Sequence, residues 1–285
     1  MLRRDPSAER EARIHPLRRH VTAFAQRLHA AEGRRLCPTR VVFIHLPKTA
    51  GSSVNAYFKA RLGGSWRGQA LTVTDAALAR PGMARLAAGA RFVGGHFGAG
   101  ALEAVGPDAF RFTVLRDPLE RLASAWRFFQ SHRRRELHMP FDRIEAALAS
   151  DHPRVVAALD NVMARQLSGG ASGSGDAAVV AAAAETLRGL DRVAWQGSFD
   201  ADFAEILAAL GLPPAPAPLR ANVTLDPDRR GRDPSRPLPP LPPRDELGEM
   251  AAPWIRLDRA VVEEWRQQAT ATGTGRTGAP PPRGA

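Results

Sequence analysis

The sequence predicts an α/β domain with a central parallel sheet. Two observations support this. Short apolar, β-branched runs alternate along the chain with longer segments of helical periodicity. Several of these runs stop at proline or glycine, which are poorly tolerated inside a central strand. Such alternation of strands with helices is typical of a parallel α/β sheet. The expected strands are residues 41–46, 91–97, 111–117 and 193–199.

Helices are expected between and after these strands. The predicted segments are residues 54–61, an alanine-rich helix within 63–90, then 119–130, 141–149, 153–167, 176–189, a helix from Asp200 or Asp202 to about 210, and 257–269. Near the N-terminus, apolar residues at 4-3-4 spacing predict an amphipathic helix; they are Leu17, Val21, Phe24 and Leu28.

A single large domain is expected at residues 38–268, since 285 residues suffice for a sizeable core. Residues 1–37 are expected to form a basic helical extension. Residues 269–285 are rich in Thr, Gly and Pro and are expected to be a disordered tail. Within the domain, residues 213–243 form a Pro- and Arg-rich loop.

The net charge is +11, which suits nucleic acid, an anionic membrane surface or a polyanionic ligand, and equally a solvated arginine-rich surface. Cys37 is the only cysteine, so an intrachain disulfide and a multi-cysteine zinc site are excluded. No apolar run approaches the roughly 18–20 residues that span a bilayer, and no secretory leader is apparent. We therefore expect a soluble, cytoplasmic protein with at most peripheral membrane association.

The first strand leads into a loop with the features of a phosphate cradle. Ser52 or Ser53 is expected to N-cap the next helix, whose free N–H groups and dipole favour an anion. Lys48 adds a mobile positive charge; it is one of only two lysines, with Lys59, among 40 basic residues. The cradle consists of Pro47, Lys48, Thr49, Ala50, Gly51, Ser52 and Ser53.

A second motif, Arg-Asp-Pro-Leu-Glu-Arg-Leu-Ala-Ser, runs from the third strand into the following helix. Arg116 closes the strand, and Ser124 follows about two turns into the helix. A guanidinium matches phosphate with two parallel hydrogen bonds. The alternative is that Arg116 only pairs with Asp117 or Glu120, and that Ser124 is merely exposed. Arg121 and Ser124 are expected opposite the apolar stripe of this helix.

Together the two motifs resemble those of the PAPS-dependent sulfotransferases, and His-Leu-Pro-Lys-Thr-Ala-Gly-Ser-Ser looks most like the carbohydrate (Golgi-type, sulfotransferase family 2-like) branch. The resemblance implies a P-loop-like three-layer fold with a central parallel sheet flanked by helices. It also implies that residues 47–53 bind the 5′-phosphosulfate of 3′-phosphoadenosine 5′-phosphosulfate, and that Arg116 and Ser124 hold its 3′-phosphate.

The resemblance extends loosely over residues 38–268. Residues 160–169, 195–199 and 222–224 are similar to further family segments in the expected order. The Pro-rich insertion after Asn222 and the Gly-Gly-His-Phe form around His96 depart from the family pattern. These departures leave the nucleotide-covering loop and the general base open.

The activity implied is transfer of a sulfuryl group to a hydroxyl of a glycan, glycolipid or similar acceptor, with no metal required. In such in-line transfers catalysis consists mostly of positioning and of neutralising charge on the leaving oxygen. We assign the neutralisation to Lys48. His96 is the first candidate for general base, because it ends a strand at the ligand-binding edge of the sheet; a structural role is the alternative. His45 is expected to be a core residue, and Glu103 and Glu120 are further candidate bases.

Other functions remain open from the sequence. A P-loop kinase or NTPase is supported by Asp117, which could hold magnesium, but Lys48 precedes the only loop glycine, unlike G-x-x-x-x-G-K-[ST]. A nucleic-acid-binding protein would explain the charge, although aromatic residues make up only 6% of the chain. A catalytically inactive nucleotide-binding protein is a third alternative.

Overall fold

The computed structural model describes residues 28–63, 69–105, 108–132, 135–169, 175–216 and 238–271. Most of the predicted N-terminal amphipathic helix lies outside these ranges, and only its end is seen, as a helix over residues 28–36. Residues 217–237 of the Pro- and Arg-rich loop, including 222–224, and the tail from residue 272 also lie outside them.

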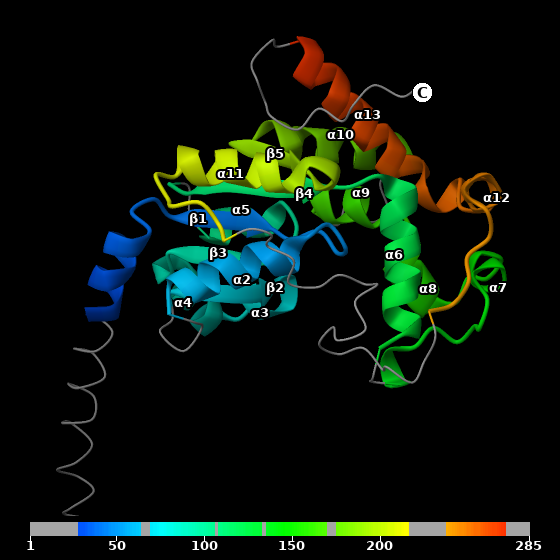
Figure 1. The fold of residues 1–285 in the computed structure, drawn as a ribbon, viewed down its shortest axis with the longest axis horizontal. Coiled ribbons are helices and arrows are strands. Elements are labelled where there is room, and N and C mark those ends of the chain that lie inside the picture. The colour runs from blue at the N-terminus through cyan, green and yellow to red at the C-terminus, as the bar shows by residue number, and fades with distance from the viewer. Residues whose placement is uncertain are drawn as a thin grey trace, which may run out of the picture.

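Five strands form one all-parallel sheet in the order β2-β3-β1-β4-β5 (Figure 1). The predicted α/β class with a parallel sheet is therefore confirmed. The strands are β1 (Val41–Ile44), β2 (Ala70–Thr74), β3 (Phe92–His96), β4 (Phe110–Leu115) and β5 (Arg192–Trp195). In the centre, Val41 of β1 is in register with Phe92 of β3 and with Phe110 of β4. The strand order changes direction between β1 and β4, and ligands of open α/β sheets bind beside the carboxyl ends of strands at such a point.

Strand β2 was not predicted, because residues 63–90 were expected to hold only a loop and a helix. It pairs with β3 alone and forms one edge of the sheet. An edge strand needs less apolar surface than a central one, so Thr72 and Thr74 are tolerated there, both exposed.

Helices cover both faces of the sheet. On one face, Val41 and Phe43 pack in a core cluster that includes residues of α2 and α11. On the other face, Val42 and Ile44 pack in a cluster that includes residues of α9, α10 and α13. The helices are α2 (Gly51–Arg61), α3 (Asp75–Leu78), α4 (Pro81–Gly89), α5 (Gly100–Val105), α6 (Pro118–Gln130), α7 (Ile144–Leu148), α8 (Pro153–Leu159), α9 (Val162–Leu167), α10 (Asp176–Arg188), α11 (Phe199–Ala209), α12 (Arg244–Met250) and α13 (Arg256–Ala271).

A third apolar cluster lies beside the sheet and includes residues of α6, α7, α8 and α12 (Figure 1). Leu122 and Trp126 of α6 are fully buried in it, as the predicted apolar stripe of this helix requires. Only two residues separate helix α6 from β4, so this helix connects the carboxyl end of the strand to the helical cluster.

Several predicted boundaries differ from the structure. Residues 153–167 form two helices, α8 and α9, because Asn161 between them adopts a left-handed conformation with φ of 45°. The strand expected over 193–199 ends at Trp195 and continues as a 3₁₀ turn, Gln196–Ser198. The last helix continues to Ala271, beyond its expected end near residue 269.

Within the described ranges, no helix has the length and apolar character that crossing a membrane demands.

Candidate functional site

The loop between β1 and α2 has a strained backbone. Lys48 and Ala50 have φ angles of 69° and 72°, in the left-handed region that residues other than glycine rarely adopt. The Thr49 hydroxyl donates a hydrogen bond of 2.8 Å to the carbonyl of Leu46, which fixes the loop from within. Non-glycine residues in this region cost of order 1–3 kcal/mol each and are concentrated at functional sites. The predicted cradle is thus held in an unusual conformation.

Helix α2 begins at Gly51, and its N-cap residue is Ala50, which provides no side-chain cap. The prediction that Ser52 or Ser53 caps the helix is wrong, because both residues lie inside the first turn. The first turn also contains no acidic residue. A helix start without a side-chain acceptor leaves backbone N–H groups and the positive end of the dipole for an external anion.

Two sequence motifs meet at this loop. The Arg116 guanidinium donates a hydrogen bond of 3.1 Å from Nη1 to the backbone carbonyl of Lys48. The Lys48 ammonium lies 4.1 Å from the centroid of the Phe128 ring, in a cation–π contact with α6. The β1–α2 loop and the β4–α6 segment are therefore in direct contact at the carboxyl edge of the sheet.

Arg116 also forms the ion pair that the alternative interpretation anticipated, with Glu120 at 3.7 Å. Partial burial lowers the pKa of Arg116, while Glu120 and Asp117 act in the opposite direction. Its Nε is buried and has no hydrogen-bond partner in the described part of the chain. Ser124 is 9% exposed, so it is not the exposed serine of the alternative interpretation.

A cleft of about 1180 Å³ opens between these elements. Of the predicted site residues it is lined by Pro47, Lys48, Ala50, Gly51, Ser52, Ser53, His96, Arg116 and Ser124. Thr49 is the exception: it is fully buried, and its side chain is turned inward to Leu46. A direct contact of the Thr49 hydroxyl with a bound phosphate is therefore not supported, and only its backbone remains a candidate.

His96 lies at the end of β3 with its ring exposed at the cleft. Its Nδ1 is 2.8 Å from the carbonyl oxygen of His45, so Nδ1 carries a proton and donates it. The Nε2 atom of the neutral ring is then an acceptor. Desolvation lowers the pKa of His96, partly offset by this hydrogen bond, which keeps the ring neutral near pH 7.

His45 differs from its prediction. It follows the last residue of β1 and lines the cleft, so it is not solely a core residue. Its ring stacks on His96 with centroids 4.3 Å apart and on Phe43 with centroids 5.6 Å apart. Its carbonyl oxygen also accepts a hydrogen bond of 3.1 Å from Gln166 Nε2, a residue of α9.

Sequence reasoning missed several cleft residues. Phe128 continues the series Glu120, Ser124, Phe128, whose spacing of four places all three on one side of a helix, so helical phase could have identified it. Residues 196–201 also line the cleft, and their position after a parallel strand was an available signal. Arg244 of α12 had no such signal, because it reaches the cleft only through the tertiary fold.

The other candidate residues have structural partners. Asp117 caps α6: its Oδ1 accepts a hydrogen bond of 3.0 Å from the Glu120 amide and lies 3.8 Å from Arg244. Glu120 lines the cleft but pairs with Arg116 and, at 3.5 Å, with Arg244. The side chain of Glu103 lies outside the described structure. No group of three or more His, Cys, Asp or Glu side chains in the described ranges could hold a metal ion.

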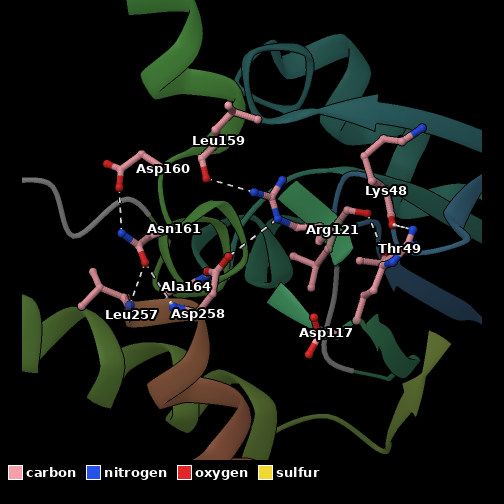
Figure 2. A network of polar contacts seen from close by, with 12 residues as sticks. Lys48, Thr49, Asp117, Arg121, Leu159, Asp160, Asn161, Ala164, Leu257 and Asp258 are labelled. Carbon is pink, nitrogen blue, oxygen red and sulfur yellow. Dashed lines mark hydrogen bonds and ion pairs between the residues drawn. The ribbon is translucent and has the colours of Figure 1, made fainter. Parts of the chain in front are cut away.

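A buried polar cluster supports α6 away from the cleft (Figure 2). Arg121 is fully buried and donates hydrogen bonds of 3.3 and 3.0 Å to the carbonyls of Ala158 and Leu159. Its Nε lies 3.7 Å from Oδ2 of Asp258, which is also fully buried. This cluster joins α6 to the ends of α8 and α13.

Asn161 completes the cluster at the break between α8 and α9. Its Oδ1 accepts hydrogen bonds of 2.7 and 3.3 Å from the amides of Leu257 and Asp258 (Figure 2). The backbone N–H of Asn161 donates a hydrogen bond of 2.7 Å to the carbonyl of Trp254. Asp258 in turn accepts a hydrogen bond of 2.8 Å from the Ala164 amide. Asn161 therefore accepts hydrogen bonds from the backbone N–H groups at the start of α13, and it also separates α8 from α9.

No protein-family model and no curated protein sequence matches this chain.

Proposed function

We propose that this protein is a sulfotransferase that uses 3′-phosphoadenosine 5′-phosphosulfate and transfers its sulfuryl group to a hydroxyl, on a P-loop-like three-layer fold. The observation that carries the proposal is the contact between the two motifs: Arg116 donates to the Lys48 carbonyl, and both residues line one cleft with Ser124. The motifs resemble the two halves of a sulfate-donor nucleotide site, and their contact is what a shared ligand requires.

The loop would bind the anionic 5′ end of the nucleotide. Support comes from the uncapped start of α2, which leaves N–H donors for an external anion. Lys48 would neutralise charge on the phosphate oxygen that departs as the sulfur–oxygen bond breaks. Its ammonium rests on Phe128, a contact that a more strongly charged partner can replace.

Arg116 and Ser124 would hold the 3′-phosphate. Arg116 lines the cleft, and its two terminal nitrogens carry four N–H groups, of which the contacts to the Lys48 carbonyl and to Glu120 occupy only part. Ser124 lies just under two turns from the start of α6 and lines the same cleft. The guanidinium can donate two parallel hydrogen bonds to phosphate oxygens, and the hydroxyl can donate one.

His96 would accept the proton of the acceptor hydroxyl as that oxygen bonds to sulfur. Its Nδ1–H is occupied by the His45 carbonyl, which leaves Nε2 as the acceptor atom. The depressed pKa keeps Nε2 unprotonated at neutral pH. Proton, sulfuryl group and leaving phosphate are thereby all accounted for without a metal ion.

The main rival function, a magnesium-dependent NTPase, has less support. It needs Asp117 as a metal ligand, but that carboxylate caps α6 and lies beside Arg244. A carboxylate used in this way would have to give up a cap and an ionic contact to bind magnesium. The nucleic-acid-binding alternative has no specific geometric support at the cleft.

The acceptor we propose is a sugar hydroxyl of a glycan or glycolipid, following the branch that the loop resembles. The cleft is large enough for more than a nucleotide alone and includes the apolar side chains of Phe128, Phe129 and Leu247. Apolar and aromatic surface of this kind packs against the faces of sugar rings as well as other apolar groups.

The deciding experiment is calorimetric titration with adenosine 3′,5′-bisphosphate and with ATP, each in the absence and in the presence of magnesium. We expect the bisphosphate to bind and Arg116→Ala to weaken it about 10- to 100-fold, because a charged hydrogen bond is lost. Ser124→Ala should weaken it less. Arg259→Ala, on the exposed side of α13, is the matched control and should leave affinity unchanged. Binding of ATP that requires magnesium, with no bisphosphate binding, would refute the proposal.

A further inference from the structure

His45 has a defined hydrogen-bonding state because of a single neighbour. Asn55, in the second turn of α2, is buried with 7% exposure and lies with its amide nitrogen 3.4 Å from His45 Nδ1. The same nitrogen donates a hydrogen bond of 2.9 Å to the carbonyl of Gly51, and the Asn55 oxygen accepts one of 3.4 Å from the Thr72 hydroxyl. These partners fix which end of the amide is nitrogen.

The Asn55 amide has two hydrogens, and each has an acceptor. One points to the Gly51 carbonyl and the other to His45 Nδ1. A nitrogen that accepts a hydrogen bond carries no proton in a neutral imidazole, so the proton of His45 is on Nε2. His45 is therefore a neutral N–H donor at Nε2.

The surroundings keep the ring in this neutral form. Burial, followed by the neighbouring His96 and Lys48, lowers the pKa of His45 to about 3. Protonation at neutral pH would place a second positive group beside Lys48 and would also break the Asn55 contact. The ring thus presents a donor without adding a full charge.

The Nε2 edge of His45 faces the start of α2. A Cβ atom added to Gly51 would lie 1.9 Å from His45 Cδ2 and 2.2 Å from Nε2, so this ring edge is packed against the first residue of the helix. Within the described part of the chain Nε2 has no hydrogen-bond partner, although the ring lines the cleft. A donor at this point adds to the N–H groups at the helix start.

We propose that His45 donates its Nε2–H to an oxygen of the anionic group bound at the start of α2, and that Asn55 is the positioning residue that holds this tautomer. The inference deepens the proposed function and rests on it for the identity of the anion, the phosphosulfate end of the nucleotide. His45 and His96 then form a stacked pair of opposite polarity. His96 presents an acceptor at Nε2, and His45 presents a donor at the same atom.

The first test is nitrogen NMR on protein labelled in its eight histidines, with His45 assigned by substitution. We expect His45 to show the Nε2–H tautomer from pH 5 to 8. Titration with inorganic sulfate should shift its Nε2 resonance. In Asn55→Asp the carboxylate accepts from the ring, so we expect the proton on Nδ1 and a higher pKa for His45. An Nδ1–H tautomer in the unmodified protein would overturn the proposal.

The second test is affinity for adenosine 3′,5′-bisphosphate. His45→Phe keeps the stacked ring but removes the donor, and we expect binding about 10- to 100-fold weaker with the fold intact by circular dichroism. His45→Gln keeps a terminal N–H and should recover part of the loss, whereas Asn55→Asp should lose affinity although His45 is still present. His29→Phe, outside the cleft, is the matched control and should change nothing.

The outcomes separate this inference from the proposed function. Bisphosphate binding that His45→Phe leaves within twofold would refute the role of His45 and leave the sulfotransferase proposal intact. If the protein binds no bisphosphate but inorganic sulfate shifts His45 Nε2, and His45→Phe abolishes sulfate binding, the donor role holds and the sulfotransferase proposal fails. An unshifted Nε2 with both ligands refutes the donor role.

Discussion

Arg116 and Arg121 lie five residues apart in one motif, yet their surroundings differ. Arg121 is fully buried, with two carbonyls as acceptors and Asp258 as counter-ion (Figure 2). Arg116 lines the cleft, donates to the carbonyl of Lys48, and has a side chain that is 22% exposed. Arg116 can therefore contact a ligand in the cleft, whereas the hydrogen-bonding groups of Arg121 are directed to partners within the protein.

The same contrast holds for the backbone. Asn161, in the buried cluster, adopts a left-handed conformation, and its side chain accepts hydrogen bonds from two amides. Asparagine tolerates this conformation better than most residues. Lys48 and Ala50, at the cleft, adopt it without that tolerance. Strain that is offset locally supports the fold, whereas strain at an open loop is a feature of functional sites. The comparison therefore predicts stability effects in the cluster and activity effects at the loop.

The largest effect on stability is expected from Arg121→Met. The substitution leaves Asp258 fully buried without its counter-ion and removes the donors for two carbonyls. Loss of one partner of a buried ion pair costs about 3–5 kcal/mol in free energy of unfolding. Urea denaturation at pH 8 measures it. Arg259→Met, on the exposed side of α13, should change stability by less than about 0.5 kcal/mol. Equal effects of the two variants would contradict a structural role for Arg121.

Lys48→Ala should show the opposite behaviour, with lost activity and a retained fold. If Lys48 neutralises the leaving oxygen, turnover should fall about 10²–10³-fold, as when one charge-stabilising donor is removed from an active site. Lys59→Ala, the other lysine, is the matched control, since Lys59 lies in the last turn of α2. The test compares steady-state turnover and urea midpoints of both variants. A loss below tenfold for a folded Lys48→Ala protein would exclude Lys48 from the mechanism.

Gly51→Ala should lower the free energy of unfolding by a smaller amount, and it tests the contact between the start of α2 and the His45 ring. Its Cβ would lie 1.9 Å from His45 Cδ2, and overpacking of this kind costs about 1–3 kcal/mol. In the double variant with His45→Ala the clash is removed, so the two free energies of unfolding should be non-additive. Gly82→Ala is the control, because nothing lies within 4 Å of its added Cβ. Additive effects in the double-mutant cycle would disprove the contact.

Much of the fold could be predicted from the sequence because its central strands are apolar and continuous. The four expected strands form, with shorter ends, whereas β2 was missed because an edge strand with alternating threonines has a weak signal. The break at Asn161 has neither proline nor glycine to indicate it. The break depends on hydrogen bonds that the Asn161 side chain accepts from backbone amides of α13, and these form only in the tertiary structure.

The site was predicted as two motifs, and the structure shows that they touch. Local sequence could not reveal the left-handed backbone at Lys48 and Ala50, since neither residue type favours it. Nor could it reveal that Asn55 meets His45, because this contact depends on how α2 packs against His45 and against Thr72 of β2. The inward turn of Thr49 is a third example. Residue identity indicated where the cleft lies, and packing determined which side chains line it.

The smallest predicted effect is a pH dependence in which the two regions act in opposite directions. Burial raises the pKa of Asp258 to about 6 from 3.8, so the folded state binds its proton more readily than the unfolded state does. Its contribution to stability is then complete below pH 3.8 and is lost as the pH rises through about 6. For His45 the pKa is lowered from 6.5 to about 3, so its contribution is present above pH 6.5 and is lost as the pH falls towards 3.

Between pH 4 and 6 these two contributions partly cancel, and single substitutions should uncover each of them. The free energy of unfolding of the unmodified protein minus that of Asp258→Asn should increase as the pH falls, with a slope of at most about 1.4 kcal/mol per pH unit. The corresponding difference for His45→Phe should decrease over the same range. Urea denaturation at pH 4.5, 5.5 and 6.5 measures both. A flat difference for Asp258→Asn would mean that Arg121 holds the carboxylate ionised throughout, and the buried cluster would then be a permanent ion pair.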